Sequence, residues 1–201
     1  MPLQINGKTI GNVFYGSTQI AEVYRGSTLV WQNVPKVTIT GTSGTQARDS
    51  FRAALAERGL DYNTVETVPF SLDTSNVTSM ESMFQACYAL KSVPDMDTSN
   101  VTKMKYMFHS CSSLTSVPDM NTSKVTDMYG MFRSCSSLTL VSDMNTSNAT
   151  DVRYMFQNCR ALTDGNVRCI GKRSGVYISN MIVNSGLTRL PFYDVNGNWT
   201  G

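Results

Sequence analysis

Hydrophobic residues recur at intervals of three and four through the middle of the chain. In the first complete unit these residues are Val77, Met80, Met83, Phe84 and Cys87. Such spacing places the side chains on one face of a short helix. Leu90 and Val93 follow, and we expect both to point inward from an extended segment that leads to the next unit. Each unit therefore predicts one short helix and one short strand.

The pattern repeats every 24 residues, without a gap, over four units. The matching columns are Met83, Met107, Met131 and Met155; Phe84, Phe108, Phe132 and Phe156; Cys87, Cys111, Cys135 and Cys159; and Leu90, Leu114, Leu138 and Leu162. A single unit cannot bury its apolar face, whereas stacked units join their faces into one core. We therefore expect an α/β leucine-rich-repeat solenoid over residues 67–201, with a degenerate C-terminal cap in which Leu187, Leu190 and Pro191 echo the repeat.

A polar segment separates the apolar parts of successive units. Asp73-Thr74-Ser75-Asn76-Val77-Thr78 recurs with small changes at residues 97–102, 121–126 and 145–150. We expect Ser75 or Asn76 to cap the helix, because such side chains accept hydrogen bonds from its first amides. Stacked Asp, Thr, Ser and Asn side chains can also satisfy one another and the backbone. Calcium binding by the carboxylates is the alternative, although the loops lack the dense oxygen ligands of calcium-binding repeats; these carboxylates are Asp73, Asp97, Asp119 and Asp143.

The motif Met-Phe-x-x-Cys-x-x-Leu-x-x-Val-Pro, followed by Asp-Thr-Ser-Asn-Val-Thr-x-Met, resembles the BspA-type leucine-rich repeat, also known as DUF285. The resemblance covers residues 67 to about 163. This motif is specific for the repeat and not for an activity. Family members are mostly bacterial and phage surface or adhesion proteins, so the resemblance implies that the chain binds a macromolecule.

Residues 1–33 carry a different pattern, in which short β-type runs are separated by Asn6-Gly7 and by two Gly-Ser pairs. This pattern predicts a meander of small hairpins. Because so few residues cannot form a core alone, we expect the module to complete itself on a partner, on a copy of itself or on the solenoid. Its Val-Tyr-x-Gly-Ser-Thr-x-Val-Trp motif resembles N-terminal modules of bacteriophage virion proteins. That resemblance implies an anchoring role, for which the candidate residues are Phe14, Tyr15, Tyr24 and Trp31.

Residues 34–66 connect these two parts. Residues 37–40 predict a strand, and residues 47–58 predict a helix with Phe51, Ala54, Leu55 and Arg58 on one face. Gly59 suits the left-handed position after a helix. Because solenoids need a cover at each end, we interpret this connector as the N-terminal cap of the solenoid rather than as an independent domain.

Catalytic motifs are sparse. The chain has one histidine, His109, at a variable repeat position, where we expect an exposed side chain without a catalytic partner. Gly41-Thr42-Ser43-Gly44 lacks the lysine and the spacing of a phosphate-binding loop. The cysteines form no Cys-x-x-Cys pair, so we expect buried free thiols rather than zinc ligands; disulfides between adjacent units are the alternative. We predict no enzymatic activity, no metal site and no cofactor.

Net charge and targeting signals limit the classes of partner and the cellular location that we expect. A net charge of +2 is too balanced to indicate nucleic acid. We see no run long enough to span a membrane and no secretory signal at the start of the sequence. We therefore expect synthesis in the host cytoplasm and no membrane insertion.

Two variable columns are the candidate binding surface. The first column is Gln85, His109, Arg133 and Gln157. The second is Lys105, Tyr106, Tyr129, Arg153 and Tyr154, with Glu81 and Ser82 at these positions in the first unit. Tyrosine and arginine are enriched at interface hot spots, whereas the alternative is a solvated helix face.

Together these features predict a non-enzymatic structural protein of the phage virion, either a capsid-decorating or head-fibre protein or a minor tail protein, located on the virion surface. Residues 1–33 would bind other virion proteins, and the solenoid would bind a host surface protein or glycan. Homo-oligomers are compatible with the small N-terminal module. The alternative is a bacterial surface adhesin or host-interaction module, and a glycan hydrolase is the third hypothesis.

Overall fold

The computed structural model describes residues 36–172 and 174–200, together with the backbone of six short strands before residue 33. These strands are β1 (Leu3–Ile5), β2 (Lys8–Ile10), β3 (Phe14–Tyr15), β4 (Thr18–Gln19), β5 (Glu22–Arg25) and β6 (Thr28–Gln32). They pair antiparallel as β1–β2, β3–β4 and β5–β6. The recorded pairing gives three separate two-stranded sheets rather than one continuous meander.

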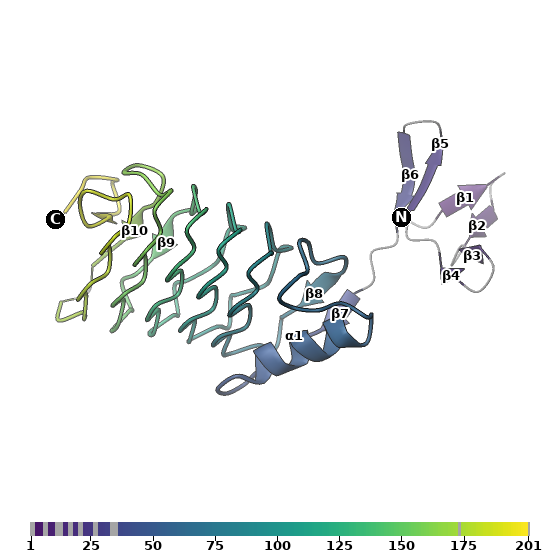
Figure 1. The fold of residues 1–201 in the computed structure, drawn as a ribbon, viewed down its shortest axis with the longest axis horizontal. Helices are drawn as coiled ribbons and strands as arrows, with labels where there is room; N and C mark the ends of the chain where they lie inside the picture. The colour runs from purple at the N-terminus through teal and green to yellow at the C-terminus, as the bar shows by residue number, and fades with distance from the viewer. Residues whose placement is uncertain are drawn as a thin grey trace.

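A strand and a helix cover the first unit of the repeat (Figure 1). Strand β7 (Lys36–Thr38) pairs parallel with β8 (Ser71–Asp73), and helix α1 (Gln46–Ala56) follows β7 in the chain. Phe51 of α1 is fully buried, and its ring meets that of Phe84 edge to face at 4.8 Å. The helix ends as predicted: Gly59 has φ 67°, and the amide of Leu60 donates to the carbonyl of Leu55.

Arg58 corrects one detail of the predicted helix. It lies beyond the end of α1 and is exposed, rather than on the buried face. Its guanidinium donates to the carbonyl of Ala54 at 2.8 Å and lies 4.9 Å from the centroid of the Phe70 ring. The aliphatic stem and planar head of arginine allow such contacts at the margin of a core.

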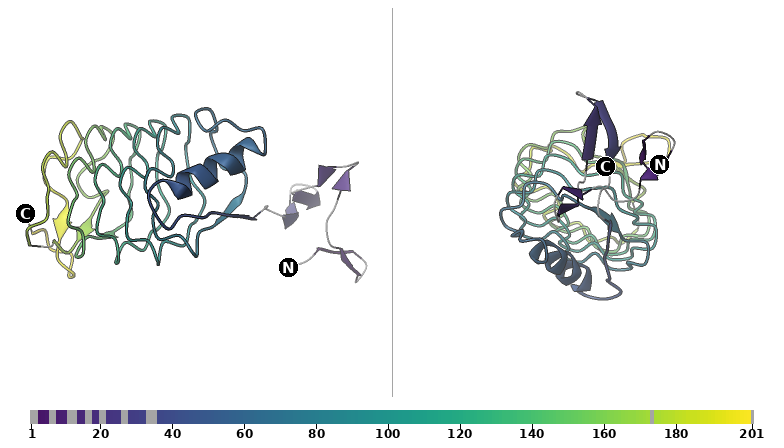
Figure 2. Two further views of the ribbon diagram at one scale, coloured as in Figure 1. Left: turned by 90° about the horizontal axis from the view of Figure 1, so that it is seen from below. Right: turned by 90° about the vertical axis from the view of Figure 1, so that its right-hand side faces the viewer.

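Beyond α1 the chain winds as a stack of similar turns, which Figure 1 shows side by side and Figure 2 shows along the stack. We call each turn a rung and number the rungs by residues 79–90, 103–114, 127–138, 151–162 and 177–187. One parallel bridge ladder connects them through Ser79, Lys103, Asp127, Asp151 and Tyr177. The step from rung 4 to rung 5 is two residues longer than the 24-residue step between the earlier rungs.

The predicted helix in each rung is wrong. Residues 80–90 form consecutive turns, in which amides donate to carbonyls three residues earlier, as in Met83 to Met80 and Cys87 to Phe84. Positive φ angles at Ser82 (58°) and Ala86 (63°) interrupt any helix and mark the third position of type II turns. Spacings of three and four also result from these turns, so the hydrophobic pattern alone could not distinguish them from a helix.

The alternating turns free every second amide to bond to the next rung. Met80, Ser82, Phe84 and Ala86 donate to the carbonyls of Lys103, Lys105, Met107 and His109, each at 2.9 Å. The same four bonds recur between all later pairs of rungs. The rungs are therefore joined by a continuous backbone ladder along this segment.

Apolar columns fill the interior between the rungs. The rings of Phe84, Phe108, Phe132 and Phe156 are fully buried and stack nearly parallel, with centroids 5.3, 5.4 and 5.7 Å apart. All five cysteines are buried free thiols. The methionine and leucine columns are equally buried, as the repeat pattern predicted.

The polar segments satisfy themselves and the backbone, as predicted. Asp73 accepts hydrogen bonds from the amide and hydroxyl of Ser75 at 3.3 and 2.8 Å, so Ser75 closes a turn rather than capping a helix. Thr74 is buried, and its hydroxyl donates to the carbonyl of Asp97 in the next unit at 2.9 Å. Equivalent threonine bonds recur at Thr98, Thr122 and Thr146.

The C-terminal end adds a small parallel sheet of β9 (Met144–Asn145), β10 (Cys169–Ile170) and β11 (Phe192–Tyr193) in the order β11-β10-β9. The chain then folds back, so that Tyr193 pairs antiparallel with Trp199. The Trp199 indole donates to the carbonyl of Leu190 at 2.8 Å. This hairpin covers the side of the stack formed by β11.

Candidate binding surface

Tyrosines from successive rungs form a row of touching rings. The centroid of Tyr129 lies 5.2 Å from that of Tyr106 and 5.3 Å from that of Tyr154. Cationic and imidazole side chains lie between and beside these rings. We define the tyrosine strip as Lys105, Tyr106, His109, Tyr129, Arg133, Arg153 and Tyr154.

The row zigzags because the tyrosines alternate between neighbouring positions of the repeat. Tyr106 and Tyr154 occupy the positive-φ position, whereas Tyr129 stands one residue earlier and Gly130 takes that position in rung 3. A Cβ atom on Gly130 would lie 2.7 Å from Cε1 of Tyr106. The missing side chain of Gly130 thus leaves room for the Tyr106 ring.

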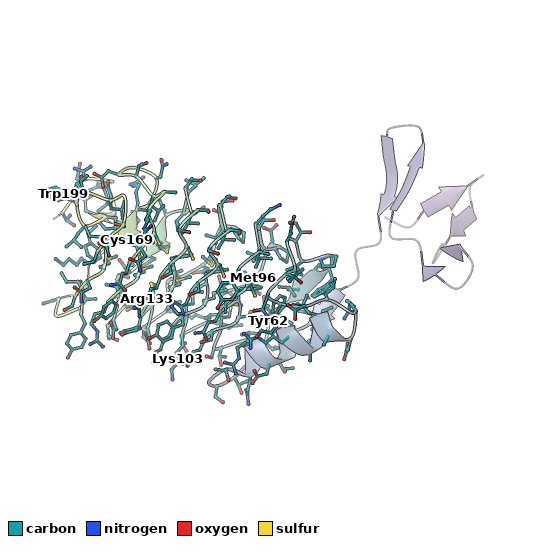
Figure 3. The ribbon with its side chains drawn as sticks, in the orientation of Figure 1. Tyr62, Met96, Lys103, Arg133, Cys169 and Trp199 are labelled. Atoms are coloured by element: carbon teal, nitrogen blue, oxygen red, sulfur yellow. The ribbon has the colours of Figure 1, made fainter. Side chains whose placement is uncertain are left out.

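Cations lie close to the ring faces. The Lys105 ammonium lies 5.5 and 5.6 Å from the ring centroids of Tyr106 and Tyr129. Arg153 lies 5.2 Å from the Tyr129 centroid, and Arg133 lies 5.4 Å from that of Tyr154. Because cations within about 6 Å of a ring centroid are attracted to its face, these groups order one another. The strip therefore offers charged groups and ring edges more than bare ring faces. Figure 3 labels Arg133 among the side chains of the stacked rungs.

One of these cations is neutralised within the chain. Arg153 pairs with Asp151 at 2.6 Å. Burial opposes ionisation of Asp151, but its hydrogen bonds to Arg153 and the charge of that residue dominate and lower its pKa. Within residues 36–172 and 174–200, no ion pair involves Lys105 or Arg133. These two residues leave the strip with excess positive charge.

The predicted column of Gln85, His109, Arg133 and Gln157 is less exposed than expected, since all four side chains are partly buried. His109 Nδ1 lies 3.2 Å from Nε2 of Gln85, and the His109 ring packs 5.2 Å from that of Tyr106. Burial and the charge of Arg133 lower the pKa of His109. His109 is thus a neutral packing residue at pH 7 rather than an exposed surface histidine.

The strip therefore unites seven of the nine predicted binding residues. Gln85 lies beside it through His109, whereas Gln157 is not part of it. The Oε1 atom of Gln157 is buried, with no hydrogen-bond donor in the described part of the chain. Sequence reasoning missed Tyr177, whose ring lies 5.3 Å from the Arg153 guanidinium and which is 63% exposed. Tyr177 lies 24 residues after Arg153, so the repeat interval itself points to it. The structure pairs it with Asp151 instead, because the step to rung 5 is two residues longer.

The predicted anchoring residues lie in strands whose side chains are outside the described residues. Phe14 and Tyr15 form β3, Tyr24 lies in β5, and Trp31 lies in β6. The anchoring role stays a prediction.

The described residues contain neither a metal-binding cluster nor a membrane-spanning helix. Over residues 36–172 and 174–200, no three His, Cys, Asp or Glu side chains are grouped so that they could hold a metal ion. In the same part of the chain, no helix has the length and apolar character needed to cross a bilayer.

Comparison with known proteins gives one match. The family model described as "Mycoplasma protein of unknown function, DUF285" matches residues 59–168, which is just over half of the chain. No curated protein and no solved structure matches the chain. The matched region begins after residues 1–33, so the resemblance of that segment to virion proteins receives no support. The matched region contains rungs 1 to 4 and the whole tyrosine strip, and the chain belongs to the DUF285 family.

Proposed function

We propose that this chain is a non-enzymatic binding protein and that the tyrosine strip contacts its partner. The observation that carries the proposal is the row of three tyrosine rings interleaved with Lys105, Arg133 and Arg153. Tyrosine and arginine dominate interface hot spots because they bury a large area and also donate hydrogen bonds. Inter-rung hydrogen bonds fix the backbone on both sides of each ring, so little conformational entropy is lost on binding.

The charge of the strip favours an acidic partner. Lys105 and Arg133 form no salt bridge in the described part of the chain. Asp127 and Asp151 lie near the strip, but three cations outnumber these two carboxylates. Cations also lie over the faces of Tyr129 and Tyr154, which leaves little bare ring for stacking on a sugar. A macromolecular surface with carboxylates complements these groups best.

Charge reversal tests the proposal. We expect Lys105→Glu combined with Arg133→Glu to weaken binding to immobilised poly-L-glutamate by about tenfold or more, and we expect wild-type binding to fall as salt is added. Lys124→Glu combined with Lys172→Glu is the matched control, since both lysines are exposed and lie outside the strip. The proposal would be refuted if the two double variants bound equally well, or if wild-type binding did not change with salt concentration. Urea titrations establish that both variants are folded.

We further propose that residues 1–33 attach the chain to a phage particle. Support comes from the Val23–Trp31 sequence pattern and from the small hairpins, which have too few residues for a core of their own. Deletion of residues 1–33 should abolish co-purification with particles while leaving poly-L-glutamate binding intact. Particle association without these residues would contradict attachment through them, and cell binding by the deleted chain would favour the adhesin hypothesis.

A further inference from the structure

The bonds between rungs have a single direction along residues 80–86 and their equivalents. In every pair, an amide of one rung donates to a carbonyl of the next rung toward the C-terminus. Rung 4 donates to rung 5 through Val152, Tyr154, Phe156 and Asn158, whose acceptors are the carbonyls of Tyr177, Ser179, Met181 and Val183 at 2.8 to 3.2 Å. Along this segment, the forward edge of each rung is therefore a row of N–H donors, and the rear edge is a row of carbonyl acceptors.

Rung 5 keeps the same backbone form but has no rung after it in the described chain. Asn180 and Asn184 have φ angles of 59° and 56°, like the equivalent Tyr154 and Asn158. The donors at these positions belong to Ile178, Asn180, Ile182 and Asn184. Within residues 36–172 and 174–200, none of these four amides has a hydrogen-bond acceptor. The last rung thus ends in a complete row of unused donors.

The apolar columns are open at the same place. The phenylalanine column is 0% exposed from Phe84 to Phe156, whereas Ile182, which continues it, is partly exposed. Ile178 likewise continues the buried column of Met128 and Val152, and it is also partly exposed. The neighbouring Val183 is 41% exposed. This open apolar end is independent evidence that rung 5 is built to be covered.

We propose that rung 5 docks a polypeptide segment of a partner protein, which adds a sixth rung to the stack. The segment offers carbonyl oxygens at alternate residues to Ile178, Asn180, Ile182 and Asn184, and it places apolar side chains over Ile178 and Ile182. Addition of a segment to an exposed backbone edge is a general mode of peptide recognition.

The direction of the ladder excludes two other occupants. A regular β-strand presents N–H and C=O groups together on one edge, so some of its amides would face the amides of rung 5. Two copies of rung 5 facing each other would oppose donors with donors. The acceptor edge of rung 1 in a second copy is covered by α1, where Phe51 packs on Phe84 and Arg52 Nη2 bonds to the carbonyl of Gln85 at 3.0 Å. The remaining occupant of rung 5 is a segment of a partner protein that has a free edge of carbonyl acceptors.

Amide hydrogen exchange of the full ¹⁵N-labelled chain tests the proposal. The four donor amides of rung 5 should exchange rapidly in the free protein, whereas those of Val152, Tyr154, Phe156 and Asn158 should be protected. The probe is a synthetic peptide of residues 127–140, whose carbonyls at Asp127, Tyr129, Met131 and Arg133 accept such bonds in rung 3. Saturating peptide should slow exchange at the four rung 5 amides by about tenfold or more, and a scrambled peptide should not.

Three substitutions make the outcome more specific. Ile182→Lys places a charge at the end of the apolar column and should abolish peptide binding, while Val195→Lys, at a site 86% exposed, should leave it unchanged. Ile182→Phe extends the phenylalanine column and should tighten binding, which keeps the test valid should Ile182→Lys fail to fold. The proposal would be overturned if the peptide left amide exchange unchanged, or if Ile182→Lys bound the peptide as well as wild type. It would also be overturned if sedimentation showed that self-association causes the protection.

Discussion

The thiol of Cys111 donates a hydrogen bond to the carbonyl oxygen of Phe84, 3.0 Å away in the preceding rung. The same bond joins Cys135 to Phe108 at 3.0 Å and Cys159 to Phe132 at 2.9 Å. Each phenylalanine carbonyl also accepts the amide of the cysteine three residues later. The cysteine column thus ties the rungs together in addition to filling space.

Removal of one of these thiols should lower stability. We expect Cys135→Ala to reduce the free energy of unfolding by about 1–3 kcal/mol, because the substitution removes a buried hydrogen bond and leaves a small void. Urea unfolding followed by circular dichroism measures the change. Ser137→Ala, in the same rung, is the control, and an equal cost for both variants would argue against a specific role for the thiol.

The thiols also predict how stability depends on pH. Burial raises the pKa of Cys87 and Cys159 to about 12 from an ordinary value of 9.0. The folded chain therefore holds these protons where the unfolded chain loses them, so this contribution is constant below pH 9 and falls between pH 9 and about 12. Each thiol contributes a slope of up to about 1.4 kcal/mol per pH unit.

Urea titrations at several alkaline pH values measure this slope. The variant Cys87→Ala combined with Cys159→Ala should show a shallower decline than wild type, because it lacks two of the buried thiols. Both proteins have the same tyrosines and lysines, so these groups do not cause the difference. Identical declines would mean that the buried thiols do not control alkaline stability.

The positive-φ residues predict a stabilising substitution. Ala86 has φ 63°, a conformation that costs a residue with a Cβ about 1 kcal/mol. Ala86→Gly should therefore raise the free energy of unfolding by about 0.5 kcal/mol, after allowance for the greater freedom of glycine in the unfolded chain. Ala53→Gly is the control with opposite sign: Ala53 is exposed on α1, where glycine should cost about 0.5–1 kcal/mol. Destabilisation by both variants would contradict the assigned backbone conformation.

Gly130 and Tyr106 should be energetically coupled. Gly130→Ala places a Cβ 2.7 Å from the Tyr106 ring at φ 57°, so we expect a loss of about 1–2 kcal/mol and a displaced Tyr106 ring. Tyr106→Ala removes the obstacle, and the double variant should lose less than the sum of the single variants by about 0.5 kcal/mol or more. Urea unfolding of the four proteins measures the coupling, and additive losses would show that the ring does not occupy this space.

The sequence predicted the register of the rungs better than their backbone. Identical side chains at identical intervals located the phenylalanine and cysteine columns, because stacking requires it. Helix α1 and Gly59 followed from amphipathic spacing and from the left-handed preference of glycine. The turn conformation escaped prediction because Ser82 and Ala86 in the first unit carry no glycine-like signal, although Gly130 and Asn158 at the equivalent positions do.

The candidate surface was predicted as separate columns and found as one strip. Variable positions identified Tyr106 and Tyr129, but the columns alone did not show that Arg133 crosses to Tyr154 or that Gly130 makes room for a ring. Those relations depend on contacts between rungs, and sequence spacing contains no such distances. Tyr177 was missed although it lies 24 residues after Arg153, because the expected columns ended at rung 4.

The single direction of the bonds along residues 80–86 and their equivalents has an electrostatic consequence for this side of the stack. Aligned peptide groups add their dipoles, as they do in an α-helix, and the sum places positive potential at the N–H end and negative potential at the carbonyl end. Along this side of the molecule the carbonyl end is rung 1, where Arg52 donates to the carbonyl of Gln85. The N–H end is rung 5, beside Tyr177 and the last cation of the strip, Arg153. We therefore expect the backbone to polarise this side of the stack, so that the acidic partner we propose would be attracted toward the C-terminal rung before any side chain makes contact.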